Sequence, residues 1–303
     1  MSIRNTYITL CYKLKYGSTV EWYNFWSIIL RKKNKIIPQV ASISETIHKI
    51  IEDHCSVSRF GDGEVLLTSP DKSIRFQKGD QLLAKRLTEV IKSDNEGHII
   101  CISDAFQDLY RYNRKSRRFW RTHFFIYGSW WDRLLTPGRK YYNTFVTRPY
   151  MDFTLKENSG QWFNDMKNIW KNRDVVFIEG EKSRLGIGND LFNNARSIRR
   201  ILGPAQDAFD RIEELKNEAC KLEKDVLFLI ALGPTATILA YDLYKAGYQA
   251  IDVGHVDVEY EWWRMKANKK IKLEQKYVNE IAIGSEVGDA GDEYRKQIIA
   301  KVI

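Results

Sequence analysis

The sequence is poor in cysteine. Four of its 303 residues are cysteine, and no two of them have the spacing of a metal-binding pair. A chain of this length can bury a sizeable core and does not need disulfide bonds. The scarcity argues against a disulfide scaffold or a cysteine-based zinc site. We expect free thiols in a reducing cytoplasm.

Long apolar runs are also missing. The longest, Val226–Leu232, fits a buried strand and is much shorter than the roughly 20 residues that a transmembrane helix needs. The N-terminus lacks the charge, apolar run and small-residue cleavage site of a signal peptide. We therefore expect a cytoplasmic protein, and peripheral contact with the inner face of the cytoplasmic membrane stays open.

Acidic residues are fewer than basic ones. There are 48 Lys and Arg against 39 Asp and Glu, and the basic residues are densest in Lys32–Lys35, Arg111–Arg121 and Lys266–Lys272. A basic surface attracts nucleic acid, anionic lipid or phosphorylated substrates. The sequence has no zinc knuckle, RNA-recognition signature or basic-region helix, so we do not expect a nucleic-acid partner.

The chain does contain a regular alternation of strand and helix patterns, without repeats or low-complexity segments. This order predicts an α/β fold, Rossmann-like, with a mostly parallel twisted sheet flanked by helices. Residues 105–150 have poor periodicity, and we expect short helices and loops there. Strands are expected at Ser56–Phe60, His98–Ser103, Asp174–Ile178, Arg200–Leu202, Asp225–Leu232 and Ala250–Val253, and helices at Ser42–His54, Asp80–Lys92, Ser159–Lys171, Asp190–Ser197, Asp207–Leu222 and Thr235–Lys245.

Residues 1–40 differ from the rest and are expected to form an extension, with the main domain at 41–303. They combine aromatic residues such as Trp22 and Trp26 with a basic run, and Pro38 marks the boundary. This composition suits a membrane interface or a partner surface. The alternative is an N-terminal helix packed on the domain.

The first motif with chemical potential is Arg59–Glu64 (RFGDGE). Asp62 and Glu64 are two hard oxygen ligands. In extended backbone they would point to the same side, toward one divalent cation, Mn²⁺ or Mg²⁺. Gly61 and Gly63 would let the backbone approach a phosphate. An ordinary exposed turn is the alternative.

Two further glycine-containing motifs follow predicted strands, where ligands bind in parallel sheets. In Glu179–Asp190 (EGEKSRLGIGND), Arg184 is a candidate for phosphate binding. Leu232–Thr237 (LGPTAT) looks like a strand–turn–helix cradle, but it lacks the lysine of a Walker A loop. The candidate ligand-binding residues of these three motifs are Arg59, Gly61, Gly63, Glu179, Ser183, Arg184, Gly186, Asn189, Asp190, Gly233, Pro234 and Thr235.

A fourth motif, Asp252–Trp263, places His255 just after a predicted strand and a glycine. Asp257, Glu259 and Glu261 alternate behind it. A histidine at a strand end among carboxylates is a candidate for ligand contact or acid–base catalysis. A structural histidine is the alternative.

Together these motifs resemble the bacterial glycosyltransferases of the GT-D fold, a family first catalogued as a domain of unknown function. The matching blocks are Arg59–Glu64, Glu179–Asp190, Ala231–Asp242 and Ala250–Trp262, in this order, and the resemblance covers roughly residues 42–290.

The resemblance implies transfer of a sugar from a nucleotide-sugar donor, usually UDP-linked, to a glycan or lipid-linked glycan acceptor of a surface polysaccharide or glycoprotein. It implies that Asp62 and Glu64 are the metal-associated D-x-E motif, with Mn²⁺ or Mg²⁺ at the donor diphosphate. His255 and Glu261 would belong to the active site, and one carboxylate near His255 would be the base.

Two other functions remain open at this point. One is another metal-dependent nucleotide or phosphate transferase, and the other is a non-catalytic protein that binds polyanions or membranes. The sequence also leaves open a homo-oligomer.

Overall fold

The computed structural model describes residues 18–29, 36–278 and 287–303. The predicted extension at 1–40 therefore lies in part outside the described residues; within it, residues 18–29 form a helix. No helix of the described segments is both long and apolar enough to cross a membrane.

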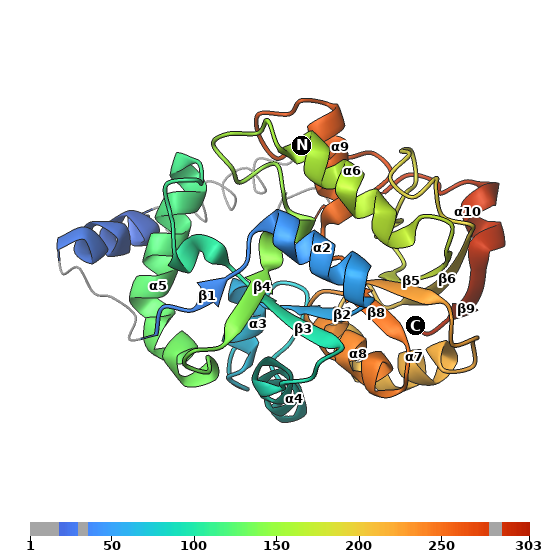
Figure 1. Ribbon diagram of the computed structural model, residues 1–303, viewed down its shortest axis with the longest axis horizontal. Coiled ribbons are helices and arrows are strands. Elements are labelled where there is room, and N and C mark those ends of the chain that lie inside the picture. Colours follow the sequence, from blue (N-terminus) through green and yellow to red (C-terminus); the bar gives the residue numbers. More distant parts are fainter. Residues whose placement is uncertain (1–17, 30–35, 279–286) are drawn as a thin grey trace, which may run out of the picture.

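One nine-stranded sheet forms the centre of the molecule (Figure 1). Its spatial order is β1-β4-β3-β2-β8-β7-β5-β6-β9, and every neighbouring pair is parallel. This confirms the predicted α/β fold. The strands are β1 (Gln39–Val40), β2 (Ser56–Arg59), β3 (His98–Ile102), β4 (Lys140–Asn143), β5 (Asp174–Gly180), β6 (Ser197–Gly203), β7 (Leu227–Ala231), β8 (Gln249–Asp252) and β9 (Ile298–Lys301).

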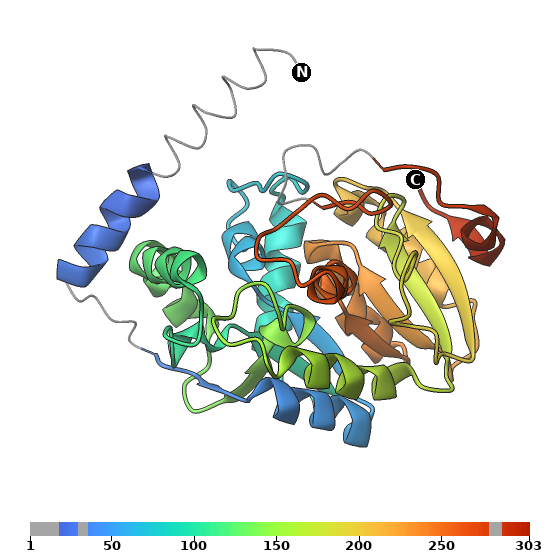
Figure 2. The ribbon, with the colours of Figure 1, turned by 90° about the horizontal axis from the view of Figure 1, so that it is seen from above.

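Helices cover both faces of the sheet. Figures 1 and 2 show α2, α6 and α9 on one face and α4, α7 and α8 on the other. The helices are α2 (Ile43–Asp53), α3 (Asp62–Leu67), α4 (Gln81–Lys92), α5 (Arg114–Leu134), α6 (Ser159–Trp170), α7 (Ile212–Ala219), α8 (Pro234–Lys245), α9 (Val256–Arg264) and α10 (Asp292–Gln297), with short 3₁₀ helices at Asp104–Phe106, Thr144–Thr147 and Ala208–Arg211.

Side chains alternate along each strand between two hydrophobic cores. In β5, Val175 and Phe177 face the core under α2, α6 and α9, whereas Val176 and Ile178 face the core under α4, α7 and α8. Because both faces are covered, β7 is apolar throughout and β5 is apolar from Val175 to Ile178.

The seam between β2 and β8 joins two half-sheets and has little backbone pairing, with one registered pair, Val57 and Ile251. Serine side chains reinforce it. The Ser56 Oγ accepts a hydrogen bond from the Ala250 N–H at 2.9 Å, and the Ser58 Oγ donates one to the Thr237 carbonyl at 2.6 Å. The first bond joins β2 directly to β8, and the second joins β2 to α8 on one face of the sheet.

The prediction for residues 105–150 was wrong. A 21-residue helix, α5, occupies much of this segment, and β4 follows it. The helical pattern is hidden in the sequence because polar or small residues, Ser116, His123 and Gly128, take buried positions beside Trp120 and Trp131.

Two predicted helices are also corrected. Asp190–Ser197 forms turns, because the Asn189 side chain accepts a hydrogen bond from the Leu191 N–H at 3.0 Å and bends the chain there. The helix predicted at Asp207–Leu222 is divided into a 3₁₀ helix, Ala208–Arg211, and the shorter α7.

Ser42 caps α2 with a reciprocal pair of hydrogen bonds. The Glu45 N–H donates to the Ser42 Oγ at 3.1 Å, and the Ser42 N–H donates to Glu45 Oε2 at 2.8 Å. We expect Ser42→Ala to lower the free energy of unfolding by about 1 kcal/mol in urea denaturation. Lys49→Ala, which breaks the surface pair with Asp53, is the control and should change it by less than about 0.5 kcal/mol. Equal losses in both variants would contradict the capping role.

Candidate functional site

The four sequence motifs converge at one edge of the sheet. They follow β2, β8, β7 and β5, which are neighbours in the sheet and run parallel. Their carboxyl ends therefore meet at the same edge, where ligands bind in open α/β sheets. A cleft of about 1390 Å³ opens there. Its lining includes these predicted residues: Arg59, Gly61, Asp62, Gly63, Glu64, Ser183, Gly233, His255 and Asp257.

Arg59, at the end of β2, is fixed against the end of β8. Its Nε donates to the Asp252 carbonyl at 3.0 Å, and its Nη2 donates to Asp252 Oδ1 at 3.0 Å. Gly254 makes room for it, because a Cβ there would lie 1.9 Å from the Arg59 Nη2. The backbone φ of Gly254 is also positive, at 44°. A guanidinium is thus held at the floor of the cleft.

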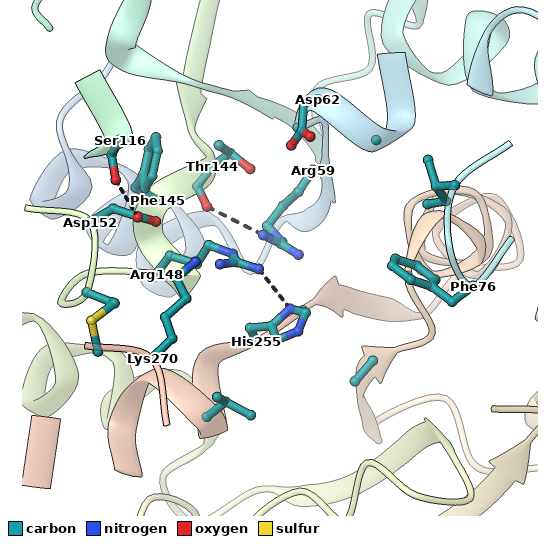
Figure 3. A pocket seen from close by; sticks show the side chains of 18 of the residues that line it. Arg59, Asp62, Phe76, Ser116, Thr144, Phe145, Arg148, Asp152, His255 and Lys270 are labelled. Carbon is teal, nitrogen blue, oxygen red and sulfur yellow. Dashed lines mark hydrogen bonds between the residues drawn. The ribbon is translucent and has the colours of Figure 1, made fainter. Parts of the chain in front are cut away.

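The side chains of Arg148 and His255 meet in the cleft (Figure 3). The Nη2 of Arg148 lies 3.1 Å from Nδ1 of His255. A guanidinium has no acceptor, so Nδ1 is the acceptor in this hydrogen bond.

Asp62 and Glu64 do not lie in extended backbone, as the sequence suggested. Gly61 is the N-cap of α3, which begins at Asp62, so the two carboxylates lie in a helical turn and not on one side of a strand. Glu64 Oε2 accepts a hydrogen bond from the Gly61 N–H at 2.8 Å. Burial, followed by the Asp252 charge, raises the pKa of Glu64 to about 7.

Asp62 differs from Glu64 because its side chain extends into the cleft near Thr144 and Arg59 (Figure 3). Among the described residues, no group of three or more His, Cys, Asp and Glu is arranged to hold a metal ion. Magnesium is commonly bound through one or two carboxylates together with substrate phosphates and water. Asp62 fits that single-carboxylate arrangement, whereas Glu64 uses one oxygen, Oε2, to cap Gly61.

The three carboxylates of α9 point to two different sides of the helix. Asp257 and Glu261, four residues apart, both accept hydrogen bonds from the Asn189 Nδ2, each at 2.7 Å. The buried Lys276 Nζ lies 2.5 Å from Asp257 Oδ2 and 3.6 Å from Glu261 Oε1. Asp257 touches the cleft, whereas Asn189 and Glu261 lie behind it and tie the loop after β5 to α9.

Glu259 points to the other side of α9 and is fully buried. Its Oε2 accepts hydrogen bonds from the N–H groups of Tyr150 at 3.3 Å and Met151 at 2.8 Å. Burial, followed by the Asp152 charge, raises the pKa of Glu259 to about 7. Glu259 does not line the cleft; it holds the segment that carries Arg148.

Glu179 also lies away from the cleft, although sequence reasoning proposed it as a donor ligand. It is fully buried and pairs with the buried Arg200 at 2.5 Å. Glu179 Oε2 accepts a hydrogen bond from the Leu185 N–H at 2.7 Å. Glu179 thus links the loop after β5, through Leu185, to Arg200 of β6. Loss of either charged partner would be strongly destabilising, because it would leave a buried charge unpaired.

Other candidates in the loop after β5 have structural contacts instead. The Arg184 Nη1 donates to the Gly288 carbonyl at 2.5 Å, and Asp190 accepts hydrogen bonds from Lys167 and Tyr260. Gly186 has a positive φ of 76° and turns the loop. Ser183 lines the cleft. Arg184, Gly186, Asn189 and Asp190 do not.

The motif after β7 forms a helix start at the cleft. Gly233 has a φ of 55°, and a Cβ there would lie 2.5 Å from the Phe76 ring. Pro234 is the first residue of α8, where its missing N–H leaves no bond unmade. Thr235 is fully buried behind the cleft, and its Oγ1 has no hydrogen-bond partner among the described residues.

Sequence reasoning missed most of the basic residues of the cleft. Several come from the start of α5 and from the chain before α6, and the sequence of these segments shows no clear periodicity. The high density of Arg and Lys at 111–121 was the one feature of the sequence that could have indicated them. Of the described lining residues, ten are basic and four acidic. The basic ones are Arg59, Arg75, Arg114, Lys115, Arg117, Arg148, Lys156, Lys182, Lys269 and Lys270.

A known family shares this arrangement of motifs. The sequence model of the glycosyltransferase GT-D fold matches residues 57–281, which is most of the chain. The chain belongs to the GT-D glycosyltransferase family. The resemblance inferred from the four motifs is thus confirmed, as is the single-domain GT-D fold.

Members of the family with known sequences include larger proteins. The chain is 40% identical over 277 residues to glycosyltransferase GlyD of Streptococcus pneumoniae, covering 91% of this chain and 34% of that protein. It is 39% identical over 266 residues to the probable glycosyl transferase Gly of Streptococcus gordonii, covering 87% of this chain and 39% of that protein. The chain thus spans little more than a third of the length of these curated relatives.

Solved GT-D structures superpose closely on this chain. One, described as a domain of unknown function 1792 with a distinct glycosyltransferase fold, has a TM-score of 0.84 at 36% identity and covers 95% of this chain and 99% of that one. Another, a new glycosyltransferase from Streptococcus sanguinis, has a TM-score of 0.83 at 37% identity and covers 88% of this chain and 100% of that one.

The buried Glu259 predicts an unusual pH dependence of stability. Its pKa of about 7 in the folded protein exceeds the ordinary value of 4.5, so the folded state binds more protons between these values and loses stability as pH rises. We expect Glu259→Gln to be about as stable as wild type at pH 4.5 and more stable by about 1–3 kcal/mol at pH 8. Urea denaturation at both pH values measures this.

Glu261→Gln is the matched control on the same helix. Because it removes a carboxylate that pairs with Asn189 and Lys276, it should destabilise the protein at pH 8. A Glu259→Gln variant less stable than wild type at pH 8 would contradict the burial argument.

Proposed function

We propose that this chain transfers a sugar from a nucleotide-sugar donor to a hydroxyl group of an acceptor glycan. The donor is a UDP-linked hexose or N-acetylhexosamine, and the acceptor belongs to a bacterial surface polysaccharide or glycoprotein. The observation that carries the proposal is the basic cleft at the carboxyl ends of β2, β8 and β7 in a chain of the GT-D family. The choice of UDP comes from the family resemblance.

The donor diphosphate would occupy the basic part of the cleft. Figure 3 places Arg59, Arg148 and Lys270 around one space. A guanidinium can bind two phosphate oxygens at once. The N-terminus of α8, at Gly233, also borders this space and favours an anion through its helix dipole. Fixed positive charge here would stabilise the departing nucleoside diphosphate.

A divalent cation, Mn²⁺ or Mg²⁺, would supply further positive charge to the diphosphate when bound. Asp62 would hold it, because its carboxylate extends into the cleft while Glu64 is occupied as the cap of Gly61. This changes the two-carboxylate site inferred from the sequence into a site with one protein carboxylate, which phosphate oxygens and water would complete.

His255 would accept the proton of the acceptor hydroxyl. Its Nδ1 accepts a hydrogen bond from Arg148, and a diphosphate that binds Arg148 would release this nitrogen. The acceptor oxygen would then bond to the anomeric carbon, whose bond to the diphosphate breaks, and the electron pair would leave with the nucleotide. Asp257 is less suited as a base because Lys276 neutralises it.

Asp62→Asn tests the cation site. With Mn²⁺ and a panel of UDP-sugars, we expect wild type to release UDP slowly from one donor and the variant to lose about 100-fold in kcat/KM. Calorimetry should show that Mn²⁺ tightens UDP binding in wild type and does not in the variant. Asp94→Asn, at an exposed position, is the control. Turnover of a nucleoside triphosphate without UDP release from any donor would favour a nucleotidyl- or phosphotransferase.

Gly254→Ala tests the position of Arg59. The new Cβ would displace the guanidinium, so we expect UDP binding, measured by calorimetry, to weaken by roughly tenfold or more. Gly247→Ala is matched, since Gly247 also has a positive φ but no atom within 4 Å of the added Cβ. Both variants pay a backbone cost of about 1 kcal/mol. Unchanged UDP binding in Gly254→Ala would exclude a role for Arg59 in donor binding.

A further inference from the structure

The helix formed by residues 18–29 rests on α5 through one face. Thr122 donates a hydrogen bond from its Oγ1 to the Val20 carbonyl at 3.3 Å, and Arg121 donates one to the Asn24 side chain at 3.2 Å. The Tyr23 ring lies 6.3 Å from the Phe125 ring. Figures 1 and 2 show this helix at the side of the molecule, next to α5.

The opposite face of this helix is apolar and exposed. Trp22, Phe25 and Ile29 are exposed by 61%, 55% and 52%, and their spacing places them on one side of a helix. Trp26 joins the stripe through ring contacts with Trp22 at 5.6 Å and Phe25 at 5.7 Å. A contiguous exposed patch of large apolar side chains marks an interaction surface.

The charge of the neighbouring helix indicates what this surface meets. The stretch Arg111–Arg121, which leads into α5, holds six basic residues and no acidic one. Arg118 pairs with Glu21 of the small helix, and Arg111 pairs with Asp104 and Asp108. The other four basic residues still give this stretch a net positive charge. Aromatic residues next to basic ones match a bilayer interface, where acyl chains lie under negatively charged headgroups.

We propose that the helix of residues 18–29 lies in the surface of a membrane that contains anionic lipid. Trp22, Phe25 and Ile29 enter the boundary between headgroups and acyl chains, and the positive charge at the start of α5 attracts the negatively charged headgroups. Trp is enriched at this depth, and interfacial helices carry Trp and Phe on their apolar face. Basic residues near the surface add electrostatic attraction.

Docking of this helix on a membrane would also affect the cleft. The first residues of α5, Arg114, Lys115 and Arg117, line the cleft, while its middle turns carry the small helix. One rigid helix thus links the membrane surface to the cleft. This consequence rests on the proposed function: it places a lipid-linked acceptor glycan within reach of the cleft.

Co-sedimentation of the full chain with vesicles tests the proposal. We expect wild type to bind phosphatidylcholine vesicles that contain phosphatidylglycerol, less at high salt, and to bind pure phosphatidylcholine weakly. The double variant Trp22→Glu, Phe25→Glu should lose roughly tenfold or more in partitioning. Leu82→Glu on α4, where Leu82 is 56% exposed, is the matched control and should bind like wild type.

Sedimentation velocity without lipid identifies the competing partner. A wild-type dimer that becomes monomeric in the double variant, with no vesicle binding, would overturn the proposal and assign the face to a second copy of the chain. Wild type that stays in the supernatant, or a double variant that binds as well as wild type, would also overturn it. The vesicle assay contains no nucleotide-sugar donor, and UDP release is measured without vesicles. Failure of the membrane proposal can therefore be told apart from failure of the proposed sugar transfer.

Discussion

The pairing of β2 with β8 is the constraint on which the cleft depends. It joins a half-sheet built from β1 to β4 to one built from β5 to β9, and Ser56 and Ser58 support it where backbone pairing is sparse. Arg59 and Asp252 end these two strands with an ion pair at 3.0 Å. Because the cleft opens on this seam, its floor contains groups from both halves of the sequence, and loss of register would separate Arg59 from His255.

Much of the fold and the edge that carries the site could be predicted from the sequence, because strand and helix patterns are local and parallel strands bring their ends together. The conformation of Asp62 and Glu64 could not, since a strand that turns into a helix at Gly61 reverses the direction of the second carboxylate. Helix α5 was missed because its buried face includes polar residues such as His123. Arg148 was missed because only tertiary packing brings it to His255.

The acidic residues singled out in the sequence mostly serve the scaffold. Glu179 balances Arg200, Glu259 holds the Tyr150–Met151 backbone, and Glu261 shares Asn189 with its neighbour. The basic residues, less conspicuous as motifs, dominate the lining of the cleft. This division is physically reasonable: a buried carboxylate can order a loop, whereas a cleft for a diphosphate needs positive charge and few competing anions.

The close approach of Arg59 to Gly254 has a consequence for the evolution of the family. The guanidinium occupies the volume that any larger side chain at position 254 would need. Glycine there could be exchanged without moving the guanidinium only after, or together with, the arrival of a shorter residue at position 59. Substitutions at these two sites, 195 positions apart in the chain, should therefore be inherited as a pair, and relatives that keep the arginine should keep the glycine.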